Sequence, residues 1–230
     1  MNTHIKKILR VLERDHAKEL KPIVDKVAAR LMDKNNRYKI NPKDTPMGMG
    51  YELIPLAELS TIIQPKEYHV YKIFASNIDL YTGEGNCNTR TGRFLKGLHG
   101  KNLECESHAS DELHRLIQES RIDGEKLENN LYISSVNIAQ DVAPDYSKLS
   151  LEKYSYVADD TFYIKPEIDR LVLTEEIEHK FKPIGIYIER EVMRMHGSLL
   201  NKNNMTMLNE AKSKNQERFI KTFGTNVVVS

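Results

Sequence analysis

The sequence is poor in cysteine and tryptophan, and it has no long apolar run. Its 230 residues include two cysteines, Cys87 and Cys105, and no tryptophan. Two cysteines are too few for the disulfide framework of a small secreted domain, so a reduced protein is favoured. Charged residues interrupt the apolar ones near the start, and no stretch approaches the length of a membrane span. We therefore expect a soluble, cytoplasmic protein with no signal peptide and no membrane partner.

The sequence also lacks an excess of charge of either sign. Lysine and arginine number 34, aspartate and glutamate 33, and the formal net charge is +1. No strong overall field points to nucleic acid, so a nucleic-acid enzyme would have to concentrate its basic residues locally. The most basic stretch outside the central segment is a helix-like tail, Leu208 to Phe219, preceded by Lys202. Phosphate contacts would explain these charges. A solvated helix face, the commoner case, explains them without any function.

The segment from Tyr68 to His99 has the pattern of two short strands and a helix. His69 to Phe74 is rich in aromatic and β-branched residues, Ser76-Asn77 has turn chemistry, and the strand pattern resumes at Leu80-Tyr81-Thr82 before Gly83. The pattern predicts a hairpin with Tyr71 and Tyr81 on its two strands. After a loop rich in glycine and asparagine, Thr89 to Leu98 is typical of a short helix.

A second informative segment runs from Ile186 to Asn204. It predicts a helix that carries Glu189, followed by Leu199-Leu200-Asn201 as a sharp corner. Between the two segments, Ser110 to Ser120 is typical of an amphipathic helix. Leu131 to Ile138 alternates as a third strand would. The predicted order is hairpin, helix, helix, strand, helix.

This combination resembles the GIY-YIG nuclease family. In that family a hairpin carries the tripeptides Gly-Ile-Tyr and Tyr-Ile-Gly, a following helix presents an arginine, and a later helix carries a metal-binding glutamate. The matching residues are Tyr71, Tyr81, Glu189 and Asn201, the last twelve positions after the glutamate. His69 stands where the family has its first glycine, and Ser198 stands where its corner commonly has proline.

The resemblance implies an α/β (α+β) fold with a small, mostly antiparallel sheet flanked by helices. It implies an N-terminal helical region over residues 1–64, a nuclease core over 65–204 with an insertion at 139–183, and a C-terminal basic helix or tail over 205–230. The insertion contains two tyrosine-rich pieces that would suit an added hairpin, for recognition or for structure. The literal tripeptide Gly185-Ile186-Tyr187 is a decoy, since no second tyrosine strand follows it.

The resemblance also implies the roles of the site residues. Glu189 would hold one divalent ion, Mg²⁺ or Mn²⁺, with water molecules completing the coordination. Tyr71 would orient or deprotonate the attacking water, with Tyr81 as the second hydroxyl. Asn201 would brace the corner.

The helix behind the hairpin offers two arginines. An arginine supplies two donors to the non-bridging phosphate oxygens. Arg93 is favoured over Arg90 because Phe94, Leu95 and Leu98 place it in an amphipathic turn. His99 would correspond to the family's helix histidine.

The expected activity is metal-dependent hydrolysis of DNA by a type II restriction enzyme. The extra segments surround the core instead of forming a separate DNA-binding module, which favours restriction over homing. A restriction enzyme acts on double-stranded DNA as a homodimer or higher assembly and has a companion methyltransferase. The alternatives are a phage or mobile-element nuclease of loose specificity, and an inactive nucleic-acid-binding protein.

Two features of the first third concern the fold alone. Residues 3 to 34 have apolar residues at helical spacing, and Pro22 predicts two helices or a kink at that point. These helices would serve as a cover for the core or as a dimerisation arm. Asn41 to Gly50 is typical of a loop and Leu53 to Ile63 of a short helix.

Overall fold

The computed structural model describes residues 3–40, 68–85, 112, 115–116, 121–122, 125–142, 169–201 and 210–227. The α-helices are α1 (Thr3–Asp15), α2 (Ala17–Met32), α6 (Ile138–Asp141), α8 (Asp169–His196) and α9 (Glu210–Phe223). The strands are β1 (Tyr38–Ile40), β2 (His69–Ala75), β3 (Ile78–Gly85), β4 (Arg121–Ile122), β5 (Glu125–Lys126) and β6 (Leu131–Asn137). Two 3₁₀ turns, η1 (Lys34–Asn36) and η4 (Leu127–Asn130), complete the described elements.

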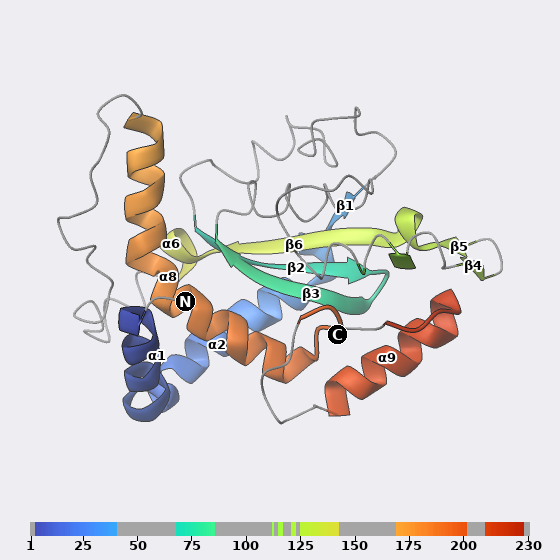
Figure 1. The fold of residues 1–230 in the computed structure, drawn as a ribbon, viewed down its shortest axis with the longest axis horizontal. Helices are drawn as coiled ribbons and strands as arrows, with labels where there is room; N and C mark the ends of the chain where they lie inside the picture. The colour runs from blue at the N-terminus through green and yellow to red at the C-terminus, as the bar shows by residue number, and fades with distance from the viewer. Residues whose placement is uncertain are drawn as a thin grey trace.

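The centre of the fold is a four-stranded antiparallel sheet in the order β1-β6-β2-β3 (Figure 1). The predicted mixed class with a small antiparallel sheet is thereby confirmed. The hairpin and the third strand lie where the alternation of residues predicts them, and Ser76, at φ 53°, begins the two-residue turn. The short strand β1, which pairs with β6, was not predicted, because three residues are too few for alternation to be seen.

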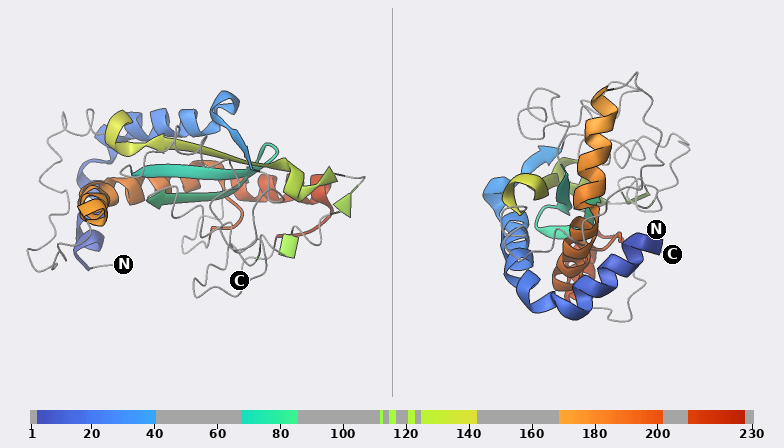
Figure 2. Two further views of the ribbon diagram at one scale, coloured as in Figure 1. Left: turned by 90° about the horizontal axis from the view of Figure 1, so that it is seen from above. Right: turned by 90° about the vertical axis from the view of Figure 1, so that its left-hand side faces the viewer.

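The two faces of the sheet carry separate apolar clusters. One face packs on α1, α2 and α8, and Figure 2 shows α2 running along that side of the sheet. The other face carries Tyr71, Ile73 and Ile133, and it packs on Phe219 and Phe223 of α9. The residues of α1 and α2 that the structure describes as buried all join the first cluster. The described apolar residues of the N-terminal helices therefore cover the core, and the expected alternative of a dimerisation arm stays a prediction.

The break between α1 and α2 falls at His16 and not at Pro22. Pro22 lies inside α2, on its exposed side. A proline removes the amide that would bond to the carbonyl four residues earlier, here that of Lys18, and on an exposed face water can satisfy that carbonyl. At the break, Nδ1 of His16 pairs with Oε2 of Glu19 at 2.8 Å. The expected position of the break was wrong, although the expected pair of helices was right.

Helix α8 begins at Asp169, inside the insertion that was expected to end at Pro183. No glycine or proline interrupts residues 170–182, and the stretch is rich in strong helix formers. Pro183 lies within the helix, and α8 changes direction along its length (Figure 1), as a helix with an internal proline commonly does. The decoy tripeptide Gly185-Ile186-Tyr187 lies inside this helix.

Gly185 allows Tyr68, the residue before β2, to approach α8 closely. A Cβ atom at this position would lie 2.3 Å from Cε1 of Tyr68, a distance that requires the ring to move. Glycine inside a helix normally costs about 1 kcal/mol relative to alanine. Here the steric demand of Tyr68 outweighs that cost.

Replacing Gly185 with alanine is therefore expected to destabilise the protein by about 1–3 kcal/mol, the usual cost of overpacking a core. The measurement is the free energy of unfolding in urea. The double variant Gly185→Ala/Tyr68→Leu, which removes the ring, should recover most of the loss. A gain in stability for Gly185→Ala alone would show that helix propensity decides at this position.

The C-terminal helix α9 covers Glu210–Phe223, whereas the sequence predicted Leu208 to Phe219. The helix ends where Gly224 adopts φ 68°, and the amide of Gly224 donates to the carbonyl of Ile220 at 2.8 Å. Glycine reaches this left-handed conformation without steric cost, so Gly224 is the stop signal that the prediction overlooked.

Several predictions lie outside the described residues. These are the loop 41–50, the helix 53–63, the helix 89–98, most of the helix 110–120, and the tyrosine-rich pieces of the insertion. Among the described helices, none combines the length and the apolar character needed to cross a membrane.

Candidate active site

The two predicted tyrosines lie side by side on the same face of the sheet. Tyr71 pairs with Gly83 across the hairpin, and Ile73 pairs with Tyr81. Residues directly opposite each other in an antiparallel pair share a face, as do residues two apart on one strand. The ring centroids of Tyr71 and Tyr81 are 6.2 Å apart, tilted by 44°. Tyr71 is buried and Tyr81 is half-buried.

Gly83 is the position that lets this tyrosine pair form. A Cβ atom there would lie 2.6 Å from both Cζ and Oη of Tyr71, and 2.9 Å from Cε1 of Tyr81. The phenol of Tyr71 therefore lies directly over the glycine backbone. In the tripeptide Tyr81-Thr82-Gly83, the glycine thus leaves space for the ring of Tyr71, and Tyr81 packs beside that ring.

Asn201 is joined to the same tripeptide from the edge of the sheet. The amide of Thr82 donates to Oδ1 of Asn201 at 2.8 Å, and Nδ2 of Asn201 donates to the carbonyl of Thr82 at 2.7 Å. One side chain thus satisfies both outward-facing backbone groups of an edge strand. Asn201 holds the residue that lies between Tyr81 and Gly83.

The residues before Asn201 also pair with β3. The amide of Leu199 donates to the carbonyl of Asp79 at 3.2 Å, and the amide of Leu200 donates to that of Leu80 at 2.7 Å. We call Ser198 to Asn201 the corner. It follows Gly197, which ends α8 at φ 66°. Asn215 of α9 donates to the carbonyls of His196 and Gly197 at 2.7 and 3.1 Å. The corner is thus fixed to β3 and α9 together.

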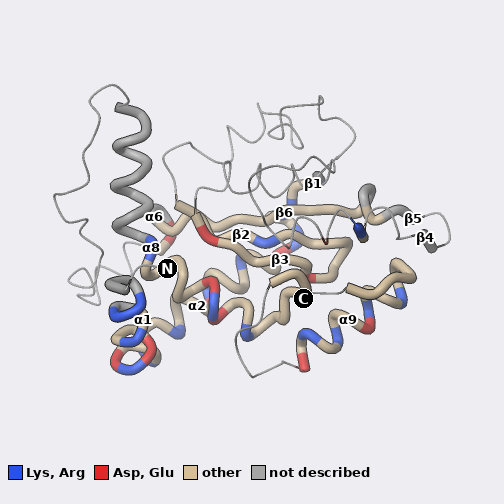
Figure 3. Tube along the Cα trace, in the orientation of Figure 1, with Lys and Arg blue, Asp and Glu red and all other residues tan. Residues whose placement is uncertain are grey.

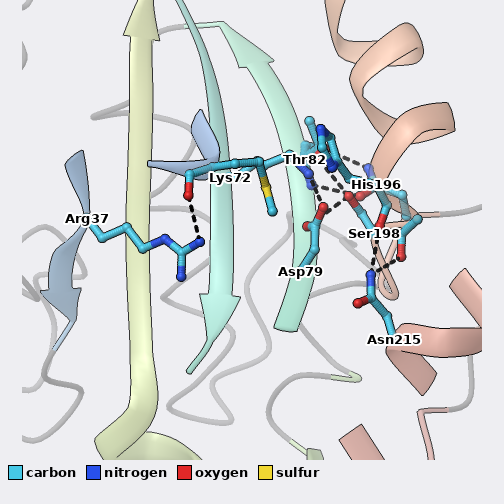
Figure 4. A network of polar contacts seen from close by, with 10 residues as sticks. Arg37, Lys72, Asp79, Thr82, His196, Ser198 and Asn215 are labelled. Carbon is cyan, nitrogen blue, oxygen red and sulfur yellow. Dashed lines mark hydrogen bonds and ion pairs between the residues drawn. The ribbon is translucent and has the colours of Figure 1, made fainter. Parts of the chain in front are cut away.

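On the opposite face of β3, a buried polar network underlies the corner (Figure 4). The ammonium of Lys72 forms an ion pair with Oδ2 of Asp79, and both side chains are almost wholly inaccessible to solvent. The hydroxyl of Ser198 donates to Oδ1 of Asp79 at 2.9 Å. The hydroxyls of Ser198 and Thr82 are 2.6 Å apart. The four side chains connect β2, β3 and the corner.

In this network the buried side chains of Lys72 and Asp79 bond to protein groups instead of to water. Burial lowers the pKa of the Lys72 ammonium well below its ordinary value, and the nearby guanidinium of Arg37 acts in the same direction. A buried ammonium without a partner would be costly, and Asp79 compensates for that cost. The sequence offered a partial signal, since Lys72 interrupts an aromatic and β-branched run. No pattern in the sequence identified Asp79 as its partner.

His196, the last residue of α8, lies close to this network. Burial, with a contribution from the charge of Lys72, lowers the pKa of its imidazole to about 4. Its Nε2 atom is buried without a hydrogen-bond partner among the described residues. Near neutral pH the folded state therefore favours the neutral form of His196.

The free energy of unfolding is accordingly expected to fall as the pH is lowered from about 6.5 to about 4. In this window the unfolded chain binds a proton at His196 that the folded protein does not bind. The shift corresponds to roughly 3 kcal/mol at most, and solvent screening of the half-buried ring reduces the expected loss to about 1–2 kcal/mol. Urea unfolding at pH 4.5 and 7 measures it. The variant His196→Gln should show a shallower dependence, and an unchanged slope would assign the effect to other groups.

Glu189 lies on α8, half-buried, twelve residues before Asn201. The helix packs against β3, the strand that carries Tyr81. Its buried apolar residues belong to the cluster on the face of the sheet opposite to Tyr71 and Tyr81. Among the described residues, no three histidine, cysteine, aspartate or glutamate side chains form a group that would hold a metal by themselves. A single half-buried carboxylate nevertheless fits Mg²⁺, which usually keeps several waters and takes one or two carboxylates.

The structure brings together Tyr71, Tyr81 and Asn201, and it places Glu189 on the helix that leads into the corner. Arg90, Arg93 and His99 lie outside the described residues. Their predicted roles stay predictions.

The basic tail contributes to the corner as well as to the surface. Nζ of Lys212 donates to the carbonyl of Asn201 at 3.2 Å, and burial lowers the pKa of this ammonium. Lys214 pairs with Glu210, while Arg218 and Lys221 are exposed. Figure 3 shows both signs of charge along α9. The surface of α9 is therefore not uniformly basic, and one of its lysines, Lys212, bonds to the corner.

Comparisons of the chain with protein-family models, with curated proteins and with solved structures find no match.

Proposed function

We propose that this protein is a divalent-metal-dependent DNA endonuclease of the GIY-YIG type. The proposal is carried by one observation. Two tyrosines ten residues apart meet on one face of a hairpin, above the glycine of Tyr81-Thr82-Gly83, and Asn201 is joined to the middle residue of that tripeptide. The hairpin and the corner, which lie far apart in the sequence and which the resemblance assigns to one site, are thus in contact.

The tyrosines would act on the attacking water. A phenol has an ordinary pKa near 10, so Tyr71 needs nearby positive charge to accept a proton at neutral pH. Arg93 is the proposed source on the protein, and its guanidinium would also bind the non-bridging oxygens of the phosphate. Tyr81 would position the water or the phosphate, and Asn201 fixes the strand on which Tyr81 stands.

Glu189 is the residue that would hold Mg²⁺ or Mn²⁺. When bound, such an ion acts as a Lewis acid and stabilises the leaving 3′ oxygen. The remaining contribution of the chain is geometric, since β3 carries Tyr81, pairs with the strand of Tyr71 and contacts the helix of Glu189.

More specifically, we propose a type II restriction enzyme that cuts a specific site in double-stranded DNA. The described part of the chain contains one tyrosine pair, so cleavage of both strands of a symmetric site would require a homodimer or a higher assembly. Such a system would include a companion methyltransferase that protects the host's own sites.

The experiment is incubation of purified protein with large unmodified plasmid or phage DNA, with Mg²⁺, with Mn²⁺ and with chelator. Discrete metal-dependent fragments are expected for a restriction enzyme. A smear of fragments would still support nuclease activity, and it would favour a phage or mobile-element enzyme of loose specificity. Intact DNA in every condition, with folded protein, would overturn the proposed activity and leave a binding protein.

Two glutamates of α8, Glu189 and Glu191, allow the proposed metal-binding role to be tested against a control. Glu189→Ala should abolish cleavage while DNA binding, measured by gel shift, is retained. Glu191 lies two residues further along the same helix and pairs with Arg194. Glu191→Ala should leave cleavage within about threefold of the parent, because a partly exposed ion pair contributes little. An equal loss of cleavage in both variants would contradict the proposed metal-binding role of Glu189.

A further inference from the structure

The corner is held to β3 by side chains as well as by its backbone. Ser198 occupies the position where related nuclease corners commonly have proline, a residue that restricts the backbone by its ring. Here the side chain of Ser198 makes two buried hydrogen bonds instead, to Asp79 and to Thr82. Ser198 is itself buried.

The direction of these hydrogen bonds follows from the ion pair. An ionised carboxylate only accepts hydrogen bonds, so with Lys72 paired to Oδ2 the hydroxyl of Ser198 must donate to Oδ1 of Asp79. A hydroxyl has a single proton, so the hydroxyl of Thr82 must donate to Ser198. The chain of donors therefore runs from Thr82 through Ser198 to Asp79, and Lys72 fixes its end.

Thr82 is consequently held from the corner by three bonds. Asn201 binds its amide and its carbonyl, and Ser198 accepts from its hydroxyl. Thr82 faces away from the tyrosine pair, but its two neighbours, Tyr81 and Gly83, face toward Tyr71. Movement of Thr82 would change the distance between the two phenols.

We propose that Ser198 is a positioning residue for the tyrosine pair, acting through Thr82 and oriented by the Lys72–Asp79 ion pair. The role of Ser198 in cleavage rests on the proposed nuclease function. Its role in holding Thr82 does not, so the two are tested by separate measurements.

The test compares Ser198→Ala with Ser134→Ala. Ser134 is also buried, lies directly across from Lys72 on β6, and its hydroxyl has no hydrogen-bond partner among the described residues. Both variants lose one buried hydroxyl from the same face of the sheet, and only the first interrupts the donor chain. Hydrogen exchange by NMR reports the amide of Thr82, with the amide of Ile73 in the central strand as the reference for global unfolding.

In Ser198→Ala the exchange of the Thr82 amide, relative to Ile73, should be about tenfold faster than in Ser134→Ala, the change that corresponds to loss of one buried hydrogen bond. For DNA cleavage, kcat should fall by about tenfold with KM within about twofold, since bound DNA still meets the same surface. Thr82→Ser keeps the hydroxyl and should retain kcat, whereas Thr82→Val should resemble Ser198→Ala.

Equal relative exchange in the two serine variants would overturn the proposal. Faster exchange with unchanged kcat would also overturn it, because Ser198 would then hold the corner without positioning the tyrosines. If the parent protein cuts no DNA, the proposed function fails, and the exchange ratio alone decides whether Ser198 holds Thr82.

Discussion

For the proposed nuclease, replacing Tyr71 with phenylalanine is expected to lower the rate of DNA cleavage by about 100-fold to 10,000-fold. This is the usual contribution of a group that transfers a proton in the transition state, the role proposed for Tyr71. The fold should be unaffected. The ring of Tyr71 would still pack over Gly83 and beside Tyr81, and only the hydroxyl would be lost. The measurement is the single-turnover rate of cleavage with Mg²⁺, together with the free energy of unfolding.

Tyr68 provides the matched control for this prediction. It is buried three residues earlier, and its hydroxyl has no hydrogen-bond partner among the described residues. Tyr68→Phe should therefore cut DNA at the parent rate and be as stable as the parent, or slightly more stable. If Tyr71→Phe cleaves within about threefold of Tyr68→Phe, Tyr71 has no part in the chemistry, and its packing on Gly83 is its whole role.

Replacing Asp79 with asparagine is expected to destabilise the protein by about 3–5 kcal/mol, the cost of leaving a buried charge without its partner. Lys72 would remain in the core with no carboxylate beside it, and Ser198 would lose a charged acceptor. Total stability in domains of this kind is about 5–15 kcal/mol, so the variant should unfold at much lower urea concentration.

A double-mutant cycle with Lys72→Met separates the charge from the packing. Removing both partners should cost much less than the sum of the two single changes, because no charge is then left buried. The exposed pair Lys21–Asp25 serves as control, and Asp25→Asn should change stability by less than about 0.5 kcal/mol. Additive losses at Lys72 and Asp79 would contradict the ion pair as the cause.

The hairpin was predictable because each strand is long enough for the alternation of residues to appear. Tyr71 and Tyr81 could be placed on the strands from that alternation, whereas Asn201 was identified only by the family resemblance. The contact between Asn201 and Thr82 joins positions 119 residues apart, and only the resemblance linked those two segments before the structure did. The predicted arginine helix lies outside the described residues, so that part of the site stays a prediction.

The features that the sequence did not predict depend on interactions between residues that are far apart in the chain or on the packing of the fold. A lysine in an apolar strand is a sign of a buried partner, but Asp79, Ser198 and Thr82 are identified only when β2, β3 and the corner are brought together. The position of Pro22 within α2 is similar, since its tolerance depends on which side of the helix faces water. Local patterns contain neither kind of information.

The corner also determines how two copies of this chain can meet. Sheets often associate by pairing their exposed edge strands, which adds one sheet to another through backbone hydrogen bonds. Along β3 the outward carbonyls of Asp79 and Leu80 and both backbone groups of Thr82 are already bonded to the corner. A continuous eight-stranded sheet through this edge would have to displace the corner and, with it, the support of the tyrosine pair. A homodimer that preserves the site must therefore be built from other surfaces.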